Sequence, residues 1–230
     1  MDAVSCTREA VGARYGVVDT GVTPPPLSDA REALVALSAA LAAKDDAALD
    51  AVLRRARRDA DATAVEETIL QSYLFLGYPA ALNAFARWRT LTGSAPGTPV
   101  DDGEEWGQRG ERVCQAVYGG QYERLRANVR RLHPDMERWM VEEGYGKVLG
   151  REGLDLATRE LCIVALLAVL EAPRQLYSHL RGALNVGASE AEIARALEVA
   201  RPFGSGSAAA EARDTWASVR ERPARPATGA

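Results

Sequence analysis

Two ionisable residues stand in the most apolar part of this sequence, and together they could perform acid–base chemistry. Glu160 and His179 lie within RELCIVALLAVLEAPRQLYSHLRGALNVG, residues 159–187, which is otherwise rich in Leu, Val and Ala. Burial disfavours the charged form of a carboxylate unless a cation compensates for it. A histidine beside such a carboxylate is oriented through one ring nitrogen and can transfer a proton with the other. The pattern therefore indicates general acid–base chemistry that uses neither a nucleophile nor a metal ion.

Helical geometry can bring these two side chains together. Asp155 is a good N-cap for a helix over residues 156–170, and Pro173 suits the first turn of the next helix. A tight turn joins the two helices, so they should be antiparallel. At 1.5 Å per residue, the two side chains then lie within roughly 6 Å of each other in height.

The other local signals are also helical. Gly187 is expected to end the second helix, and Ser189 with Glu192 forms a capping box for a third helix at about 190–200. No segment shows the alternation of a strand, and alanine is abundant while aromatic residues are sparse. We therefore predict an all-α fold.

Structural interpretations of the same residues stay open. A carboxylate near the first turn of a helix is favoured by the helix dipole, and Glu160 could simply pair with Arg159 or Arg181. His179 could equally be a structural histidine at the edge of an apolar stripe. The second histidine of the chain, His133, precedes a proline and is interpreted as a capping or packing residue.

Composition limits the classes of function. The chain has 230 residues, 47% hydrophobic, with a formal net charge of −4, so there is no overall basic field to attract nucleic acid. The longest apolar run, residues 161–170, is about half the length of a membrane span, and the first residues lack a signal-peptide core. We expect a cytoplasmic protein that binds neither nucleic acid nor a membrane.

The cysteines suggest neither a disulfide framework nor a zinc site. Cys6, Cys114 and Cys162 are an odd number and form no CxxC motif. Cys162 is interpreted as a small core residue. The sequence thus predicts no metal site and no cofactor.

Breaker residues divide the chain into five parts. Proline and glycine clusters separate two mostly helical blocks from their surroundings. We expect an N-terminal arm at 1–26, a first repeat at 27–90, a linker at 91–107, a second repeat at 108–218 and a disordered tail at 219–230.

The two blocks look like copies of each other. A shift of 128 residues superimposes Arg31-Glu32 on Arg159-Glu160, and it also aligns two aromatic positions at Phe75/Phe203 and Trp88/Trp216. An internal duplication follows. Trp88, Trp139 and Trp216 are interpreted as core or interface anchors.

Residues 153–193 resemble the carboxymuconolactone decarboxylase family and its alkylhydroperoxidase D-like relatives. The elements that carry the resemblance are L-x-x-x-T-R-E, an apolar helix, H-L-R-G-A-L-N-x-G and S-x-x-E-I. LQSYLFLGYPAALNAF, residues 70–85, is similar to a later helix of the family, which ends in an aromatic–Gly–aromatic–Pro turn. The resemblance implies an all-helical protein that assembles into trimers or hexamers, here with two repeats packed as a pseudo-dimer.

The resemblance assigns roles to residues of this chain. The redox branch of the family uses a Glu, a CxxC pair and a His, which fall on Glu160, on Ala172 and Gln175, and on His179. Because the cysteine positions are not cysteines, hydroperoxide reduction is the less favoured alternative. The decarboxylase branch implies that His179 donates a proton to carbon, Glu160 orients it, and Arg181 binds a carboxylate of a small substrate.

The halves differ in what they retain. The first repeat has Ala51 or Val52 where the second has His179, so it cannot perform the same chemistry alone. One hypothesis is that both halves share a single site, lined in part by Tyr73, Tyr78 or Glu67. A helical assembly or binding protein that kept the fold and lost the chemistry is the remaining alternative. In each case the apolar helices should be buried between copies, in a homo-oligomer.

Overall fold

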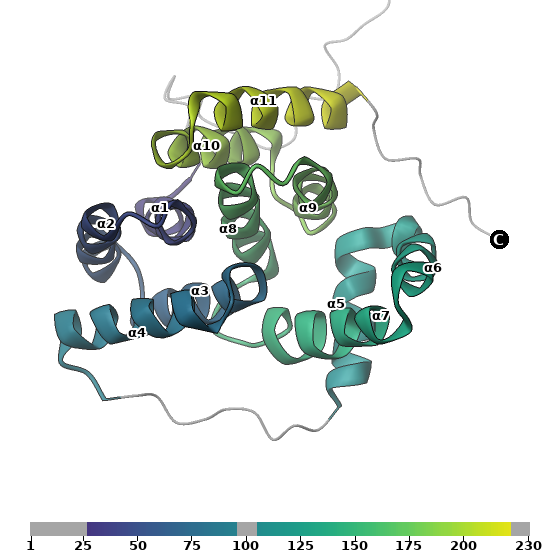
Figure 1. Ribbon diagram of the computed structural model, residues 1–230, viewed down its shortest axis with the longest axis horizontal. Coiled ribbons are helices and arrows are strands. Elements are labelled where there is room, and N and C mark those ends of the chain that lie inside the picture. The colour runs from purple at the N-terminus through teal and green to yellow at the C-terminus, as the bar shows by residue number, and fades with distance from the viewer. Residues whose placement is uncertain (1–26, 96–104, 222–230) are drawn as a thin grey trace, which may run out of the picture.

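The fold is a set of helices, as predicted. The computed structural model describes residues 27–95 and 105–221, and within these ranges it contains helices, turns and no strand (Figure 1). The predicted arm at 1–26 lies outside the described residues, as do most of the linker and the last nine residues of the tail.

The first four helices form one set. They are α1 (Asp29–Ala43), α2 (Asp46–Asp59), α3 (Ala62–Leu76) and α4 (Tyr78–Thr92). Ser28, Asp45 and Asp61 cap the first three by accepting hydrogen bonds from backbone N–H groups of the first turn. Gly77, with a φ of 79°, makes the sharp corner between α3 and α4, which a side chain would strain.

The last helices form a second set, and the predicted caps are present. This set consists of α8 (Leu156–Val169), α9 (Pro173–Asn185), α10 (Glu190–Ala200), the short η3 (Arg201–Phe203) and α11 (Gly206–Glu221). Asp155 caps α8, Pro173 begins α9, Gly187 follows α9 with a φ of 98°, and the capping box opens α10. Residues 219–221 of the predicted tail are part of α11.

The helix bounds fit the duplication by 128 residues. Adding 128 to the bounds of α1, α2, α3 and α4 gives 157–171, 174–187, 190–204 and 206–220. The observed α8, α9, α10 and α11 begin within one residue of these values. The first residues of the four helices are therefore spaced in the same way in both sets, to within one residue.

Ion pairs cross between the sets in a reciprocal way. Arg31 of α1 binds Glu192 of α10 at 2.6 Å, and Arg159 of α8 binds Glu67 of α3 at 2.8 Å. Since α1 corresponds to α8 and α3 to α10, each set offers its arginine to the other. This reciprocity is what a pseudo-twofold packing would produce, and it supports the predicted pseudo-dimer, which remains a prediction.

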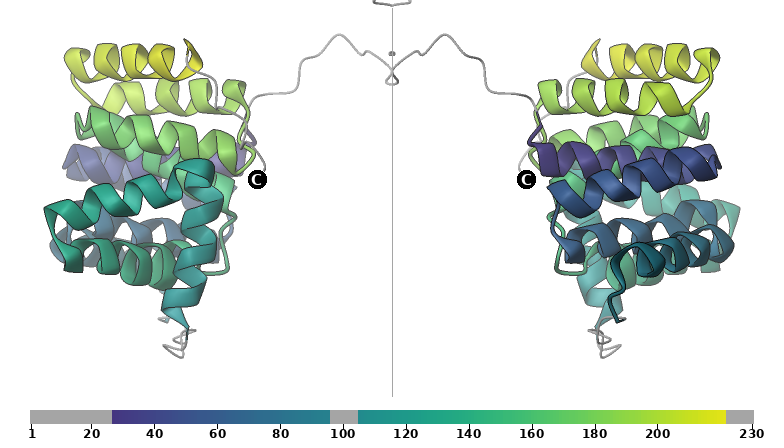
Figure 2. Two further views of the ribbon diagram at one scale, coloured as in Figure 1. Left: turned by 90° about the vertical axis from the view of Figure 1, so that its right-hand side faces the viewer. Right: turned by 90° about the vertical axis from the view of Figure 1, so that its left-hand side faces the viewer.

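Helices α1 and α8 form the centre of the core. Both are buried nearly all round, and the hydroxyl of Ser38 on α1 donates to the carbonyl of Cys162 on α8 at 2.7 Å. A helix that is apolar on all sides requires cover on all sides. The side views show how the other helices stack above and below this centre, with α11 at one end (Figure 2).

A third group of helices precedes α8. It consists of α5 (Trp106–Tyr118), η1 (Gly119–Gln121), α6 (Tyr122–Leu132), α7 (Pro134–Trp139) and a π-helical stretch, η2 (Met140–Leu149). Gly110 faces the backbone of Val141, and Gly146 faces that of Trp106, so α5 and η2 approach at distances that no Cβ would permit. The group covers the side of α9, because α5 packs directly on α9.

Two predictions about single residues in the third group have different outcomes. His133 caps α7 by accepting a hydrogen bond from the N–H of Asp135 at 3.1 Å, as predicted. Trp139, predicted as a core or interface anchor, is not part of the core, because 47% of it is exposed, whereas Trp88 and Trp216 are buried. Its role as an interface anchor remains a prediction. Helix α7 packs on α6 and on η2, and the exposed Trp139 lies at its C-terminal end.

Candidate functional site

Glu160 and His179 are in direct contact, as the helical spacing predicts. Oε2 of Glu160 on α8 lies 2.8 Å from Nδ1 of His179 on α9. The glutamate side chain is completely buried, and 9% of the histidine side chain remains exposed. The contact fixes Nδ1 and leaves Nε2, which has no hydrogen-bond partner among the described residues, to interact with a ligand.

The alternative pairing of Glu160 with Arg159 is wrong. Arg159 points to the other side of α8, where it binds Glu67 at 2.8 Å and Gln71 at 3.2 Å. Its guanidinium also donates to backbone carbonyls of the segment before α8. The guanidinium of Arg159 is therefore fully engaged by these structural contacts, and Glu160 binds the histidine instead.

Gly182 makes room for the carboxylate. A Cβ atom on this glycine would lie 2.8 Å from Oε2 of Glu160 and 2.7 Å from Cγ1 of Val117. Gly182 is three residues after His179, so both lie on the same face of α9. The absence of a side chain at Gly182 lets the carboxylate fit between α9 and Val117 of α5 and so reach the imidazole.

The second oxygen of Glu160 is unsatisfied. Oε1 is buried and has no hydrogen-bond partner among the described residues. Buried polar atoms in native proteins nearly always have a partner, and a catalytic role is one explanation for an exception. This atom marks a place where a group that carries a proton donor would be stabilised.

The equivalent carboxylate of the first set is used differently. Glu32 is bound by Arg55 at 3.0 Å and by Arg195 at 2.7 Å. Burial would raise the pKa of Glu32, but these two arginines outweigh it and lower the pKa. Where the histidine is missing, the carboxylate has therefore become part of a structural ion-pair network, while Glu160 has no arginine of this kind.

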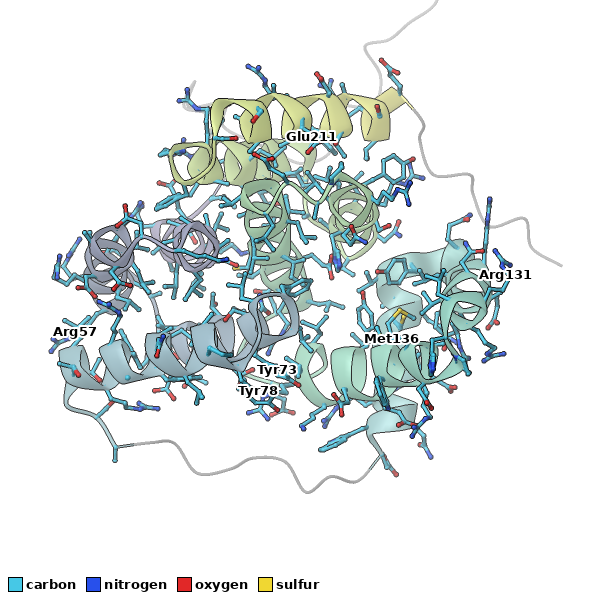
Figure 3. The ribbon with its side chains drawn as sticks, in the orientation of Figure 1. Arg57, Tyr73, Tyr78, Arg131, Met136 and Glu211 are labelled. Atoms are coloured by element: carbon cyan, nitrogen blue, oxygen red, sulfur yellow. The ribbon has the colours of Figure 1, made fainter. Side chains whose placement is uncertain are left out.

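An aromatic residue of the first set of helices contacts the histidine. The ring of Phe75 on α3 meets that of His179 edge to face, with centroids 5.9 Å apart. Of the residues that sequence reasoning placed here, Tyr73 stacks on Tyr78 at 5.0 Å (Figure 3), and Glu67 is held by two arginines. Phe75 was missed, although it belongs to the aromatic–Gly–aromatic–Pro turn that carries part of the resemblance.

Two tyrosines near the pair were also missed. The hydroxyl of Tyr145 on η2 donates to that of Tyr118 on α5 at 2.9 Å. Burial and the nearby charge of Glu160 raise the pKa of both phenols, although the hydrogen bond from Tyr145 acts in the opposite direction on Tyr118. Both hydroxyls are therefore neutral near pH 7. Nothing in the sequence links α5 and η2 to the α8–α9 hairpin.

The described cysteines are buried and poorly ionisable. Burial raises the pKa of the Cys114 thiol and of the Cys162 thiol to about 12. Both are free cysteines, and Cys6 lies outside the described residues. Since the thiolate is the reactive form, neither Cys114 nor Cys162 is equipped to attack a peroxide.

Arg181 follows His179 by two residues. On an α-helix this places it about 200° around the axis from the histidine, so the two do not share a face. The helix position therefore gives no support to the predicted role of Arg181 in binding a substrate carboxylate, and this role remains a prediction.

The described residues contain neither a cluster suited to a metal ion nor a membrane-spanning helix. Among residues 27–95 and 105–221, no group of three or more His, Cys, Asp or Glu side chains is arranged to hold a metal ion. In the same ranges, every helix is too short or too polar to cross a bilayer.

Comparison with known proteins identifies a family for part of the chain. Residues 134–217 match the carboxymuconolactone decarboxylase family, and this range includes both Glu160 and His179. The chain is also similar to "Peroxisomal protein 2" of Schizosaccharomyces pombe, with 26% identity over 144 residues that cover 59% of this chain and 66% of the relative. The chain thus spans slightly less than two thirds of that relative. The resemblance noted in the sequence is confirmed for the matched residues.

Proposed function

We propose, from the match of residues 134–217 to the carboxymuconolactone decarboxylase family, that the protein is an acid–base decarboxylase of a small carboxylated lactone or a related acid. The observation that carries the proposal is the buried contact between Oε2 of Glu160 and Nδ1 of His179, at 2.8 Å. A carboxylate that holds an imidazole in this way fixes its orientation and stabilises the imidazolium form.

The chemistry follows from the two side chains. When the carbon–carbon bond to the carboxylate breaks, CO2 leaves and the electron pair is delocalised into the neighbouring carbonyl. His179 then donates a proton from Nε2 to the carbon, and the electron pair returns from oxygen to form the new C–H bond. Glu160 compensates the charge of the imidazolium before this transfer. The carbonyl of the substrate accepts the electrons, so this reaction requires no cofactor.

The proposal is tested by CO2 release from small carboxylated lactones. The wild-type chain is expected to release CO2, and His179→Ala should lower kcat by about 10²- to 10⁴-fold, the range for loss of a general acid. His133→Ala is a matched control, because His133 is an exposed capping residue of α7. If both variants retain the wild-type rate, His179 has no catalytic role.

Two other functions have less support. A hydroperoxide reductase would need a reactive thiol, and the pKa values of about 12 for Cys114 and Cys162 disfavour that chemistry. A purely structural assembly protein would need no unsatisfied buried carboxylate oxygen such as Oε1 of Glu160. A His179→Ala chain that loses its assembly rather than its turnover would favour the structural function.

We also propose that the protein is a cytoplasmic homo-oligomer. The exposed apolar side chains Leu132, Met136 and Trp139 gather on the α6–α7 hairpin. Surfaces of this kind are stabilised by contact with a second chain. Sedimentation at micromolar concentration is expected to give a species larger than the monomer, and a monomer alone would contradict the proposal.

A further inference from the structure

The neighbourhood of Glu160 holds an uncommitted proton donor as well as an uncommitted acceptor. The acceptor is Oε1 of Glu160, which is buried without a hydrogen-bond partner in the described part of the chain. The donor is the hydroxyl of Tyr118. Because Tyr145 donates its proton to Tyr118 at 2.9 Å, the proton of Tyr118 itself points elsewhere, and it has no acceptor among the described residues.

Tyr118 is carried to the site by α5. The preceding residue, Val117, and the carboxylate of Glu160 both lie close to Gly182, since a Cβ atom on this glycine would be 2.7 Å from Cγ1 of Val117 and 2.8 Å from Oε2 of Glu160. The carbonyl of Val117 is also fixed to α9, since it accepts a hydrogen bond from Nδ2 of Asn185 at 2.7 Å. The end of α5 is therefore fixed to α9 beside the carboxylate of Glu160.

The two tyrosines are arranged as a rigid pair. Their rings meet edge to face with centroids 5.8 Å apart, and Tyr145 is buried in the π-helical stretch η2. A hydroxyl that already accepts a hydrogen bond becomes a stronger donor, because the two bonds polarise each other. Tyr145 thus orients the hydroxyl of Tyr118 and makes it a stronger hydrogen-bond donor.

We propose that the hydroxyl of Tyr118, oriented by Tyr145, stabilises the oxygen that becomes negative when CO2 leaves the substrate. This inference rests on the proposed function. The enolate oxygen accepts a hydrogen bond from Tyr118, while Oε1 of Glu160 accepts one from a donor group of the substrate, so the step uses no proton other than the one from His179. The tyrosine proton is shared during the reaction and is not consumed, since the proton added to carbon comes from His179. Tyr118 is then a catalytic residue and Tyr145 a positioning residue.

The kinetic test compares three tyrosine exchanges in the full chain. Tyr118→Phe should lower kcat about 10²-fold while KM stays within about two-fold, because the lost bond forms in the transition state. Tyr145→Phe should have a smaller effect, about 10-fold. Tyr122→Phe is the matched control, since that hydroxyl is bound by Arg126 at 3.2 Å. Thermal melts verify that each variant is folded. A Tyr118→Phe variant within about two-fold of the wild-type kcat overturns the inference.

A second test does not depend on turnover. 4-Nitrophenol is used as the probe, because its anion resembles an enolate and absorbs differently from the neutral phenol. The wild-type chain should lower the pKa of the bound probe, Tyr145→Phe should lower it less, and Tyr118→Phe should abolish the shift. Tyr122→Phe should behave like wild type. Equal shifts in wild type and Tyr118→Phe would overturn the inference.

The two tests separate this inference from the proposed function. If the wild-type chain releases CO2 and Tyr118→Phe remains fully active, the proposed function is supported and the role of Tyr118 is contradicted. If the chain releases no CO2 but lowers the pKa of bound 4-nitrophenol through Tyr118, the oxygen-binding role of Tyr118 is supported and the decarboxylase function is contradicted. If the wild-type chain shows no CO2 release and no shift in the pKa of the probe, both proposals are overturned.

Discussion

Gly182 and Glu160 are packed so closely that a side chain on the glycine would have to displace its neighbours. A Cβ atom on Gly182 would lie 2.8 Å from Oε2 and 3.4 Å from Cδ of the carboxylate. The histidine that shares this carboxylate is only three residues earlier on α9. The position of the glycine therefore sets how near the carboxylate can come to the imidazole.

Gly182→Ala should displace the carboxylate and reduce activity. Overpacking of this kind costs about 1–3 kcal/mol of stability, and the moved oxygen can no longer hold Nδ1 of His179 at 2.8 Å. We expect a lower kcat and a lower midpoint of urea unfolding. Gly107→Ala is the matched control: Gly107 lies in α5 with nothing within 4 Å of its Cβ position, and alanine should raise stability by up to about 1 kcal/mol. A Gly182→Ala chain that resembles the Gly107→Ala chain would contradict this account.

Glu67→Ala should destabilise the fold strongly. Glu67 is the ionic partner of Arg159, whose side chain is completely buried, and of Arg151 at 3.0 Å. Removing one member of a buried ion pair leaves an uncompensated charge and costs about 3–5 kcal/mol. Glu190→Ala breaks an exposed pair with Arg220 and should cost less than about 1 kcal/mol. If Glu67→Ala and Glu190→Ala lower the free energy of unfolding by equal amounts in urea, the charge of Arg159 is compensated by other groups.

Glu137 should make part of the stability dependent on pH. Burial alone would raise the pKa of its carboxyl, but Arg126 and Arg130 bind it and lower the pKa below its ordinary 4.5. A carboxyl with a lowered folded pKa stabilises the fold above its unfolded pKa and loses that contribution as the pH falls through the folded value. Urea unfolding at about pH 6 and about pH 3.5 should therefore differ less in Glu137→Gln than in wild type.

The control for this prediction is a solvent-facing carboxylate. Glu198 pairs with Arg201, and both side chains are more than half exposed. Glu198→Gln should leave the difference between the two pH values as it is in wild type. If Glu137→Gln also leaves the difference unchanged, its arginines do not stabilise the carboxylate.

The thiols of Cys114 and Cys162 should be unreactive in the folded protein. With pKa values of about 12, less than about one in 10³ of these thiols is ionised at pH 8. In a Cys6→Ser chain, thiol titration should detect nothing until urea is added, and hydrogen peroxide should not be consumed. Rapid loss of either thiol with peroxide would instead support a redox activity.

The α8–α9 hairpin could be predicted because its signals are local. The cap at Asp155, the proline at 173, the glycine at 187 and the helical spacing are all written in a few neighbouring residues. They were sufficient to bring Glu160 and His179 together across one turn. The same reasoning identified His133 as a cap.

The rest of the site could not be predicted because it depends on distant segments. Phe75, Tyr118 and Tyr145 lie 81, 38 and 11 residues before Leu156, the first residue of the hairpin, and no spacing rule connects them to it. The partner of Arg159 was likewise hidden, since Glu67 lies 92 residues away. Such contacts follow from how whole helices pack, as the close approach of α5 and η2 illustrates.

A double-mutant cycle on Glu160 and His179 tests the central claim most directly. Rates of CO2 release are compared for wild type, Glu160→Gln, His179→Ala and the double variant. If the carboxylate acts through the imidazole, Glu160→Gln should lower kcat in the wild-type background and have almost no further effect once His179 is replaced. Losses that multiply in the double variant would contradict the account, because the two residues would then act independently despite their contact of 2.8 Å.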